Sequence, residues 1–271
     1  MKTKSNRRGR RQRRYRGLLW ALAAGLLLFG LIAQQNILLG TSSRHALLMD
    51  ARTGQVLAGK RSGEVAGPGS LTNMMTVLLA TEALPDLDTP VTLPEDIFPA
   101  LYKADASMAG FQPGETVTVR DLLYGAMLPS GAECCEALAR QVSGSEEAFV
   151  ALMNRKAGEL GMKHTHFANP NGLDAPEHHS SAQDLAVLAA YAMENPIFYK
   201  TVSAKNVKVG DRYLTNHNKL LWRVAGADGV KTGFTKAAGR ILVSSATRDG
   251  RRVIVVTIDD PGDWSDHAAL M

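Results

Sequence analysis

The chain has 271 residues, of which 45% are hydrophobic and 21% charged, a composition typical of a globular protein rather than a disordered one. Residues 1–16 contain nine Lys or Arg and no acid, which leaves 22 of the 31 basic residues to balance all 26 acids. Cations confined to one terminus argue against a nucleic-acid-binding protein, because such proteins carry them as a stripe on a folded face.

A long apolar segment follows this basic leader. Its first 17 residues read "GLLWALAAGLLLFGLIA", and with "QQNILLG" the segment spans residues 17–40 without a charge. A helix of that length is about as long as a bilayer core is thick, and basic residues before it keep the amino end in the cytoplasm. We expect a single-pass membrane anchor with the domain on the extracytoplasmic face. The alternative is a cleaved signal segment that yields a secreted protein, but "LIA" is a poor small-x-small site.

The remainder, residues 41–271, is predicted to form one domain with strands from both chain ends. "HALLMD" and "QVLAG" form one hairpin, and "RILVSSAT" and "RVIVVTID" form another. Helical patterns lie between them, at 70–83, 119–128, 133–142, 145–160 and 181–193. The predicted fold class is α+β, with one antiparallel sheet and a helical lobe. The chain ends at Met271 as a helix begins, so we expect the domain to be truncated there.

The cysteines and histidines give little indication of a disulfide or a metal site. Cys134 and Cys135 are adjacent on a predicted helix, where a bridge between them would be strained, and they are interpreted as small buried hydrophobes. Four histidines (His164, His166, His178 and His179) raise the question of zinc, but they lie in loop-like stretches without a third-ligand pattern. We predict no metal and no cofactor.

Three short stretches carry the chemistry: "SLTN" at 70–73, "SGA" at 130–132 and "KTG" at 231–233. Their order resembles the Ser-x-x-Lys, Ser-x-Asn and Lys-Thr-Gly pattern of penicillin-interacting serine enzymes. Longer stretches, among them "VRDLLYGAMLPSG", "ELGMKHTHFANPNGLD" and "DGVKTGFTKAAGR", look like D-alanyl-D-alanine carboxypeptidases of the low-molecular-mass penicillin-binding class. The resemblance covers about residues 44–270 and implies a β-lactamase/transpeptidase-like fold with the active site between sheet and helical lobe.

The resemblance also implies roles for individual residues. Ser70 would attack a peptidoglycan stem peptide at the penultimate D-alanine carbonyl and form an acyl-enzyme, and Ser130 would relay a proton to the leaving amine. Lys231 and Thr232 would bind the substrate, and Gly233 and Phe234 would line the site, where the amides of Ser70 and Phe234 would face the oxyanion. β-Lactams would bind covalently if Ser70 is reactive.

Two positions depart from the pattern. Asn73 stands where the family has the lysine that accepts the serine proton, and an amide cannot act as that base. Ala132 stands where the family has an asparagine that contacts the substrate. The residues therefore predict impaired turnover.

Each residue also has a plainer interpretation. Ser70 could be a helix N-cap, Ser130 a turn residue, and "DGVKTGF" an ordinary strand after a turn. At the level of function, the alternative to a slow carboxypeptidase is an inactive relative that binds stem peptides or a cell-wall enzyme. A β-lactamase is a third possibility, disfavoured because its Ser-Asp-Asn and its deacylating glutamate have no counterpart.

Overall fold

This computed structural model describes residues 40–271, so the basic leader and residues 17–39 lie outside the described residues. Within 40–271 no helix is both long and apolar enough to cross a membrane.

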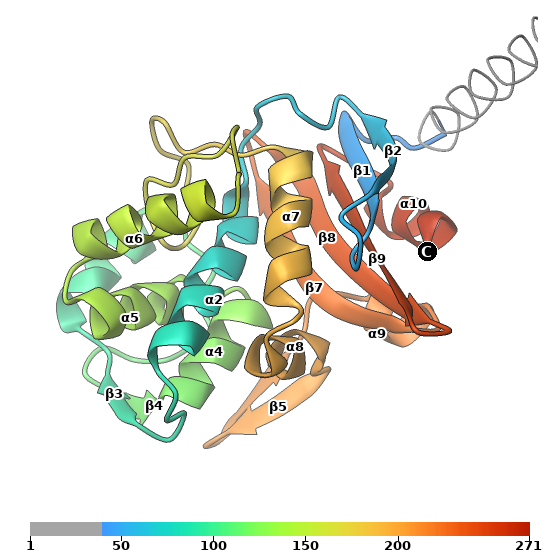
Figure 1. Cartoon of the computed structure of the whole chain (residues 1–271). Helices are drawn as coiled ribbons and strands as arrows, with labels where there is room; N and C mark the ends of the chain where they lie inside the picture. The colour runs from blue at the N-terminus through green and yellow to red at the C-terminus, as the bar shows by residue number, and fades with distance from the viewer. Residues whose placement is uncertain (1–39) are drawn as a thin grey trace, which may run out of the picture.

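The centre of the fold is a five-stranded antiparallel sheet built from both chain ends, as the sequence predicts (Figure 1). Its order is β2-β1-β9-β8-β7. The bounds are β1 His45–Asp50, β2 Val56–Lys60, β7 Ala227–Thr235, β8 Gly239–Arg248 and β9 Arg251–Ile258. The first strand pairs with the last, with Leu47 opposite Val256, because both are apolar and β-forming and bury their side chains together. The antiparallel pairing leaves β7, which carries the Lys-Thr-Gly stretch, at the edge of the sheet.

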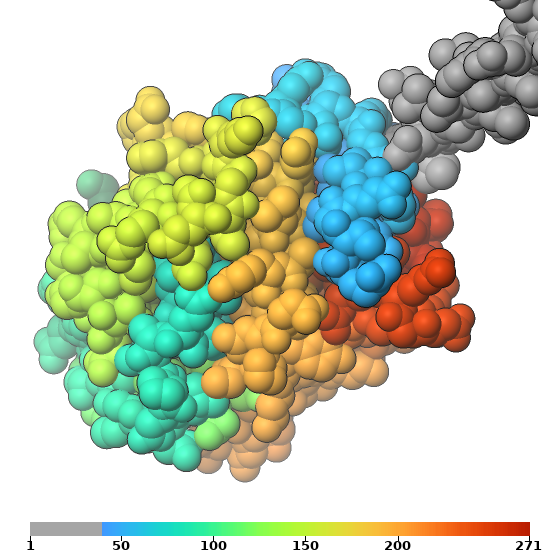
Figure 2. Space-filling view, in the orientation of Figure 1, coloured from blue at the N-terminus to red at the C-terminus, as the bar shows by residue number. Residues whose placement is uncertain are grey.

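A helical lobe lies beside the sheet, and α7 runs between the two (Figure 1). The space-filling view shows residues of about 185–220 packed between the lobe and the strands of the two chain ends (Figure 2). The lobe and its connections contain η1 Gly69–Thr72, α2 Asn73–Ala83, η2 Glu95–Ile97, α3 Phe98–Lys103, α4 Val119–Met127, α5 Ala132–Ser143, α6 Glu146–Glu159, α7 Ala182–Ala192, α8 Pro196–Ser203 and α9 Leu220–Arg223. All five predicted helices are confirmed.

The sequence interpretation missed several short elements. Two small hairpins decorate the fold, β3 Pro90–Thr92 with β4 Thr116–Thr118 and β5 Asn206–Val209 with β6 Arg212–Thr215. The helix that the sequence indicates at the end of the chain is observed as α10, Asp263–Leu270, which packs on β8 and β9.

Helix α2 is the centre of the core. Every residue of α2 from Asn73 to Thr81 is buried, so the buried positions cover all sides of the helix. A helix that is apolar on all sides must be surrounded by protein. Sheet and helices enclose it, so its first turn, which follows Ser70, is held firmly in place. Cys134 and Cys135 are buried and free, which confirms their interpretation as core residues.

Candidate active site

A cleft of about 340 Å³ lies along the edge strand β7. It is lined by Ser70, Ser107, Ser130, His217, Lys219, Thr232, Gly233, Phe234, Arg240, Ile241, Asp263 and Trp264. Three of the predicted stretches, far apart in sequence, therefore contribute to one cavity, and the predicted residues Ser70, Ser130, Thr232, Gly233 and Phe234 all line it.

Ser70 lies within the short turn η1, directly before α2. The residues that precede η1 and α2 are Pro68 and Thr72, and neither makes a side-chain cap, so the N-cap interpretation of Ser70 is wrong. The surrounding backbone is packed tightly. A Cβ atom on Gly233 would lie 3.3 Å from the Ser70 nitrogen, and one on Gly172 would overlap the Gly69 carbonyl. Only glycine lets β7 and the loop around Gly172 approach the serine so closely.

Ser130 and Lys231 form a direct pair. The Lys231 Nζ atom donates to Ser130 Oγ at 2.9 Å and to the Thr232 carbonyl at 2.7 Å. Ser130 has a φ of +70°, a strained conformation for a residue with a side chain, and this strain fits a functional position better than an ordinary turn. The fully buried Lys231 ammonium has only neutral oxygen partners, and burial lowers its pKa to about 7. A large fraction of Lys231 is therefore neutral at physiological pH and can accept a proton from Ser130.

Asn73 is completely buried at the start of α2. Its Nδ2 atom donates to the Ala126 carbonyl at 2.9 Å and only weakly, at 3.5 Å, to Ser130 Oγ. Its Oδ1 atom is buried with no hydrogen-bond partner among residues 40–271. Asn73 can thus help to hold Ser130, but it provides no basic atom for the Ser70 proton.

Ala132 begins α5 and is buried. Its amide donates to the Ser107 carbonyl at 2.8 Å, which brings Ser107 to the cleft wall. The buried Glu133 carboxylate accepts amide hydrogen bonds from Ala109, Gly110 and Phe111, so the loop is fixed without any polar side chain at position 132. The position offers the substrate only a methyl group.

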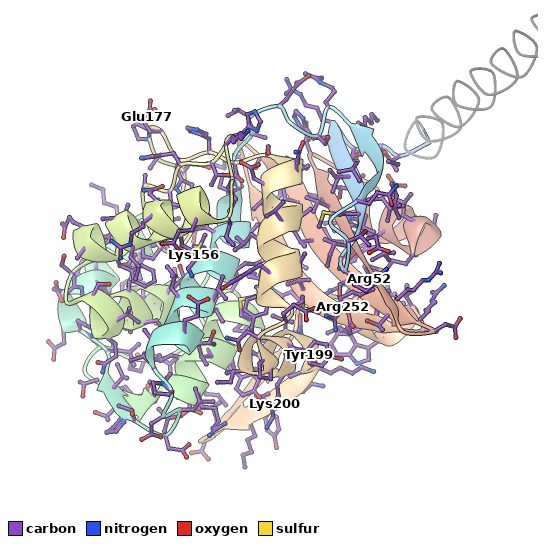
Figure 3. All side chains as sticks on the ribbon, viewed as in Figure 1. Arg52, Lys156, Glu177, Tyr199, Lys200 and Arg252 are labelled. Atoms are coloured by element: carbon purple, nitrogen blue, oxygen red, sulfur yellow. The ribbon has the colours of Figure 1, made fainter. Side chains whose placement is uncertain are left out.

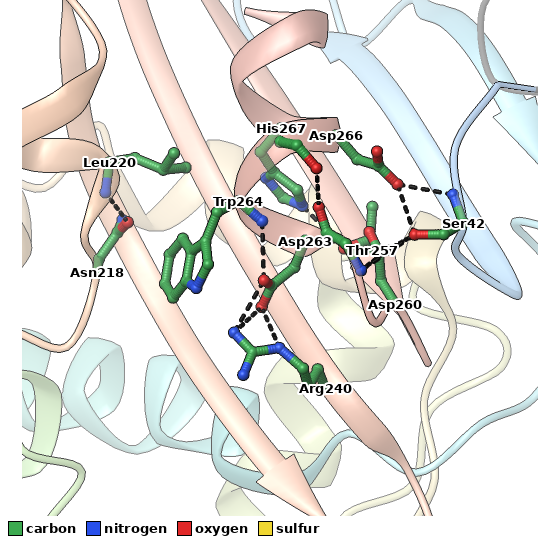
Figure 4. Close-up of polar contacts among 12 residues, drawn as sticks. Ser42, Asn218, Leu220, Arg240, Thr257, Asp260, Asp263, Trp264, Asp266 and His267 are labelled. Atoms are coloured by element: carbon green, nitrogen blue, oxygen red, sulfur yellow. Dashed lines mark hydrogen bonds and ion pairs between the residues drawn. The ribbon is translucent and has the colours of Figure 1, made fainter.

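Arg240 was not predicted, and it adds a cation to the lining of the cleft. Figure 4 shows its contacts with Asp263. Its guanidinium makes paired hydrogen bonds of 2.9–3.1 Å to Asp263 and lies 5.7 Å from the Trp264 ring. The Nη1 donors make no hydrogen bond to residues 40–271, and 44% of the side chain is exposed. Arg240 pairs with Phe234 across β7 and β8, so it and Thr232 are diagonal neighbours on one face, with side chains about 7 to 8 Å apart.

Comparison with known proteins follows this geometry. A family model described as D-alanyl-D-alanine carboxypeptidase (Peptidase S11) matches residues 32–262. The chain belongs to this family.

Its relatives include DacF of Bacillus subtilis and DacD of Escherichia coli, each named a D-alanyl-D-alanine carboxypeptidase. DacF is 37% identical over 227 residues, which cover 80% of this chain and 57% of DacF. DacD is 37% identical over 256 residues, which cover 88% of this chain and 65% of DacD. The chain thus matches less than two thirds of the length of each of these relatives.

Solved structures of the family share the fold. A Streptomyces DD-transpeptidase superposes with a TM-score of 0.81 at 32% identity, covering 85% of this chain and 96% of that one. Penicillin binding protein 6B from Escherichia coli gives a TM-score of 0.79 at 34% identity, covering 85% of this chain and 75% of that one. The predicted transpeptidase-like α+β fold is confirmed.

In this family member His178 has a structural role. His178 Nδ1 accepts from the Ala168 amide at 2.9 Å, and Nε2 lies 2.9 Å from Thr72 Oγ1. Burial lowers the His178 pKa to about 4, so the ring is neutral and donates from Nε2 to Thr72. The ring thereby joins the loop at Ala168 to Thr72, in the turn that carries Ser70. In the part of the chain described, no group of three or more His, Cys, Asp or Glu is arranged to hold a metal ion.

Seven cleft residues were not predicted, namely Ser107, His217, Lys219, Arg240, Ile241, Asp263 and Trp264. The hairpin register contained a signal for one of them. A tight turn between "KTGFT" and "GRILV" puts Arg240 opposite Phe234. Others, such as Ser107 and Trp264, reach the cleft through tertiary docking and have no local signal.

Proposed function

We propose that this cleft binds the acyl-D-alanyl-D-alanine end of a peptidoglycan stem peptide and slowly releases the terminal D-alanine. The observation that carries the proposal is the 2.9 Å contact between Lys231 Nζ and Ser130 Oγ, in the cleft that also contains Ser70. Through this contact Lys231 can serve as the base for Ser70, with the Ser130 hydroxyl as the relay between them. Position 73 provides no base.

The reaction follows from these groups. Ser70 Oγ attacks the carbonyl carbon of the penultimate D-alanine, and its proton passes through Ser130 to neutral Lys231. The carbon–nitrogen bond then breaks, the leaving amine takes a proton from Ser130, and water hydrolyses the ester on Ser70. The substrate's terminal carboxylate lies between Thr232 and the free Nη1 edge of Arg240, which is oriented for it by Asp263.

Three observations support this assignment of the carboxylate. Arg240 and Lys219 bring two cations to the cleft, where Asp263 is the one acidic side chain among the lining residues. The pair with Asp263 fixes Arg240 before the substrate arrives, which reduces the entropy lost on binding. Thr232 adds a hydroxyl on the same face of the strands.

Impaired turnover is part of the proposal. A positioned base is worth about 10²- to 10⁴-fold, and a relay through Ser130 replaces only part of it. The second candidate function is an inactive relative that binds stem peptides or a cell-wall enzyme. It is favoured by the complete burial of Asn73 and its bond to Ala126, which leave position 73 without proton-accepting chemistry.

Restoring the lysine separates the two functions. Asn73→Lys should raise the second-order rate of acylation by penicillin at least about tenfold, because it places a base beside Ser70. Ala132→Asn alone should do less, since one amide contact is worth about 0.5 to 1.5 kcal/mol. An unchanged rate in a folded Asn73→Lys variant would favour the binding role over the enzymatic one.

The proposal also includes membrane attachment. Residues 17–40 are uncharged, follow nine basic residues and precede the folded domain. They would hold the domain on the extracytoplasmic face, where peptidoglycan lies, or release it if they are cleaved.

A further inference from the structure

The charge of the folded part is unevenly distributed along the chain. Residues 199–252 contain twelve Lys or Arg and only three Asp or Glu. Residues 40–198 show the reverse, with ten basic and nineteen acidic side chains, and residues 253–271 add four acids and no base. This imbalance is independent of the cleft, because most of the twelve cations do not line it.

The fold gathers six of these cations on one end of the molecule. We call this surface the basic end and define it by the exposed residues Lys200, Lys205, Lys208, Arg223, Arg248 and Arg251. None of the six forms an ion pair with any residue in 40–271. The acids nearby are Asp211 and Asp249 in two hairpin turns, and Glu194, which is paired with Arg252. The basic end therefore has a clear positive excess, so the expectation that the cations are confined to the amino-terminal leader is wrong.

Direct contacts join the elements of the basic end. The Lys205 Nζ atom lies 5.8 Å from the Trp222 ring, which links the start of β5 to α9. Arg248 Nε donates to the Ala225 carbonyl at 3.1 Å, which links α9 to the turn between β8 and β9. In Figure 3, Tyr199 and Lys200 of α8 lie next to Arg252 of β9 and close to β5.

Aromatic side chains lie among the cations. Tyr213 is 72% exposed and Trp222 is 47% exposed, and Lys208 lies 5.8 Å from the Tyr213 ring. The basic end thus has two exposed aromatic rings, each with a lysine ammonium 5.8 Å from it. Rings of this kind can stack on the flat faces of sugar rings, while the lysines and arginines neutralise anionic groups.

We propose that the basic end binds a linear anionic glycopolymer, a chain of sugar units bearing phosphate or carboxylate groups. Six unpaired cations spread over α8, β5, α9 and one hairpin turn match a repeating charge better than a single small ion. Binding releases counterions and is therefore strongly salt-dependent. The site is separate from the proposed peptidase function and needs no reaction at Ser70.

The position of the basic end favours a polymer over a lipid surface. β1 runs antiparallel to β9, with His45 opposite Ile258, so the chain enters the domain at the far end of β9 from Arg251. Eight strand residues separate the two ends by about 23 Å. In Figure 1 the described chain begins beside β2, away from β5 and the turn between β8 and β9. A membrane that held residues 17–40 would therefore lie at the opposite end from these cations.

The test uses the full chain in detergent micelles and three variants. The first variant removes three of the six cations of the basic end and carries Lys205→Gln, Lys208→Gln and Arg223→Gln. The matched control removes the same charge from exposed positions elsewhere and carries Lys103→Gln, Arg155→Gln and Lys163→Gln. The third variant is Trp222→Ala. The probes are long-chain polyphosphate, polygalacturonate, neutral dextran and soluble glycerophosphoglycerol, which is the head group of phosphatidylglycerol without its acyl chains. Binding is measured at several salt concentrations, by affinity electrophoresis for the polymers and by titration calorimetry for the head group.

The expected result is binding of both polyanions but not of dextran. The basic-end variant should lose at least about tenfold in affinity and show a shallower salt dependence, while the control keeps both. Trp222→Ala should weaken binding of polygalacturonate more than of polyphosphate, because polyphosphate has no sugar ring. Equal losses in the two triple variants, binding to the lipid head group alone, or no polyanion binding would overturn the proposal. The melting temperature of each variant shows whether it is folded, and penicillin labelling shows whether its cleft is intact. Neither measurement depends on polymer binding.

Discussion

Replacing Lys231 by methionine should stabilise the protein while it destroys the Ser130–Lys231 pair. The Lys231 ammonium is fully buried, and its hydrogen-bond partners are the neutral Ser130 hydroxyl and the Thr232 carbonyl. A buried cation without an opposite charge costs free energy, and natural proteins retain such a cost at functional positions. Methionine has a similar length and no charge to desolvate.

The magnitude follows from the pKa of Lys231. Burial lowers this pKa from 10.5 to about 7, and each unit corresponds to about 1.4 kcal/mol, so the charged form is disfavoured by roughly 5 kcal/mol. The substitution also removes two hydrogen bonds, worth about 1 kcal/mol each. The net gain in the free energy of unfolding is therefore about 3 kcal/mol below pH 7, where Lys231 is protonated in both states.

The gain should shrink as the pH rises. Above a pH of about 7 the folded state loses the Lys231 proton, whereas the unfolded state keeps it until about 10.5, so the wild-type protein becomes more stable over this range. Urea unfolding of both proteins at about pH 6 and about pH 9 measures the difference. Lys205→Met, at an exposed position, is the control and should change stability by no more than about 0.5 kcal/mol. A Lys231→Met protein no more stable than wild type at the lower pH would refute the reasoning.

Four further predictions follow from the site. Penicillin acylation should rise with pH through about 7 as Lys231 loses its proton, and a flat rate profile would exclude Lys231 as the base. Burial lowers the His178 pKa to about 4, so the stability that the neutral ring contributes is present above pH 6.5 and is lost as the pH falls towards 4. His178→Gln should therefore make the loss of stability between pH 6.5 and 4 less steep than in the wild-type protein. Equal slopes for the two proteins over this range would contradict the prediction. Arg240→Gln should weaken binding of acyl-D-alanyl-D-alanine about tenfold but leave binding of its C-terminal amide unchanged, as measured by titration, whereas equal losses would remove the carboxylate role. Washing membranes with carbonate should leave the full-length protein attached through residues 17–40, and its release into the soluble fraction would disprove the anchor.

Much of the fold could be predicted because its signals are local. The hairpins at 45–60 and 239–258 alternate or cluster β-branched residues, and helices such as α4 begin at a capping box in which Thr118 and Asp121 bond reciprocally. The resemblance of the three short stretches to a known family led to one cleft, which Ser70, Ser130 and Thr232 line. Strands of three or four residues, such as β3 and β5, were missed because so short a run carries no measurable period.

The rest of the site depends on packing between distant segments. Arg240 becomes a cleft residue only because α10 docks on β8 and presents Asp263 and Trp264 to it. Nothing in the sequence near Arg240 specifies that docking. The lowered pKa of Lys231 likewise results from burial, which position in the chain does not reveal. Ser70 was open to interpretation as a cap because serine favours both roles, and only the backbone of η1 excludes one of them.

Peptide mapping of the adduct formed with benzylpenicillin tests the central claim most directly, because it asks whether Ser70 is a nucleophile without a lysine at position 73. A covalent adduct is expected on the peptide that contains Ser70. The adduct should form slowly, accumulate faster above pH 7 than below it, and be absent from Ser70→Ala. A folded wild-type protein that remains unmodified at Ser70 after prolonged incubation at alkaline pH would contradict the account.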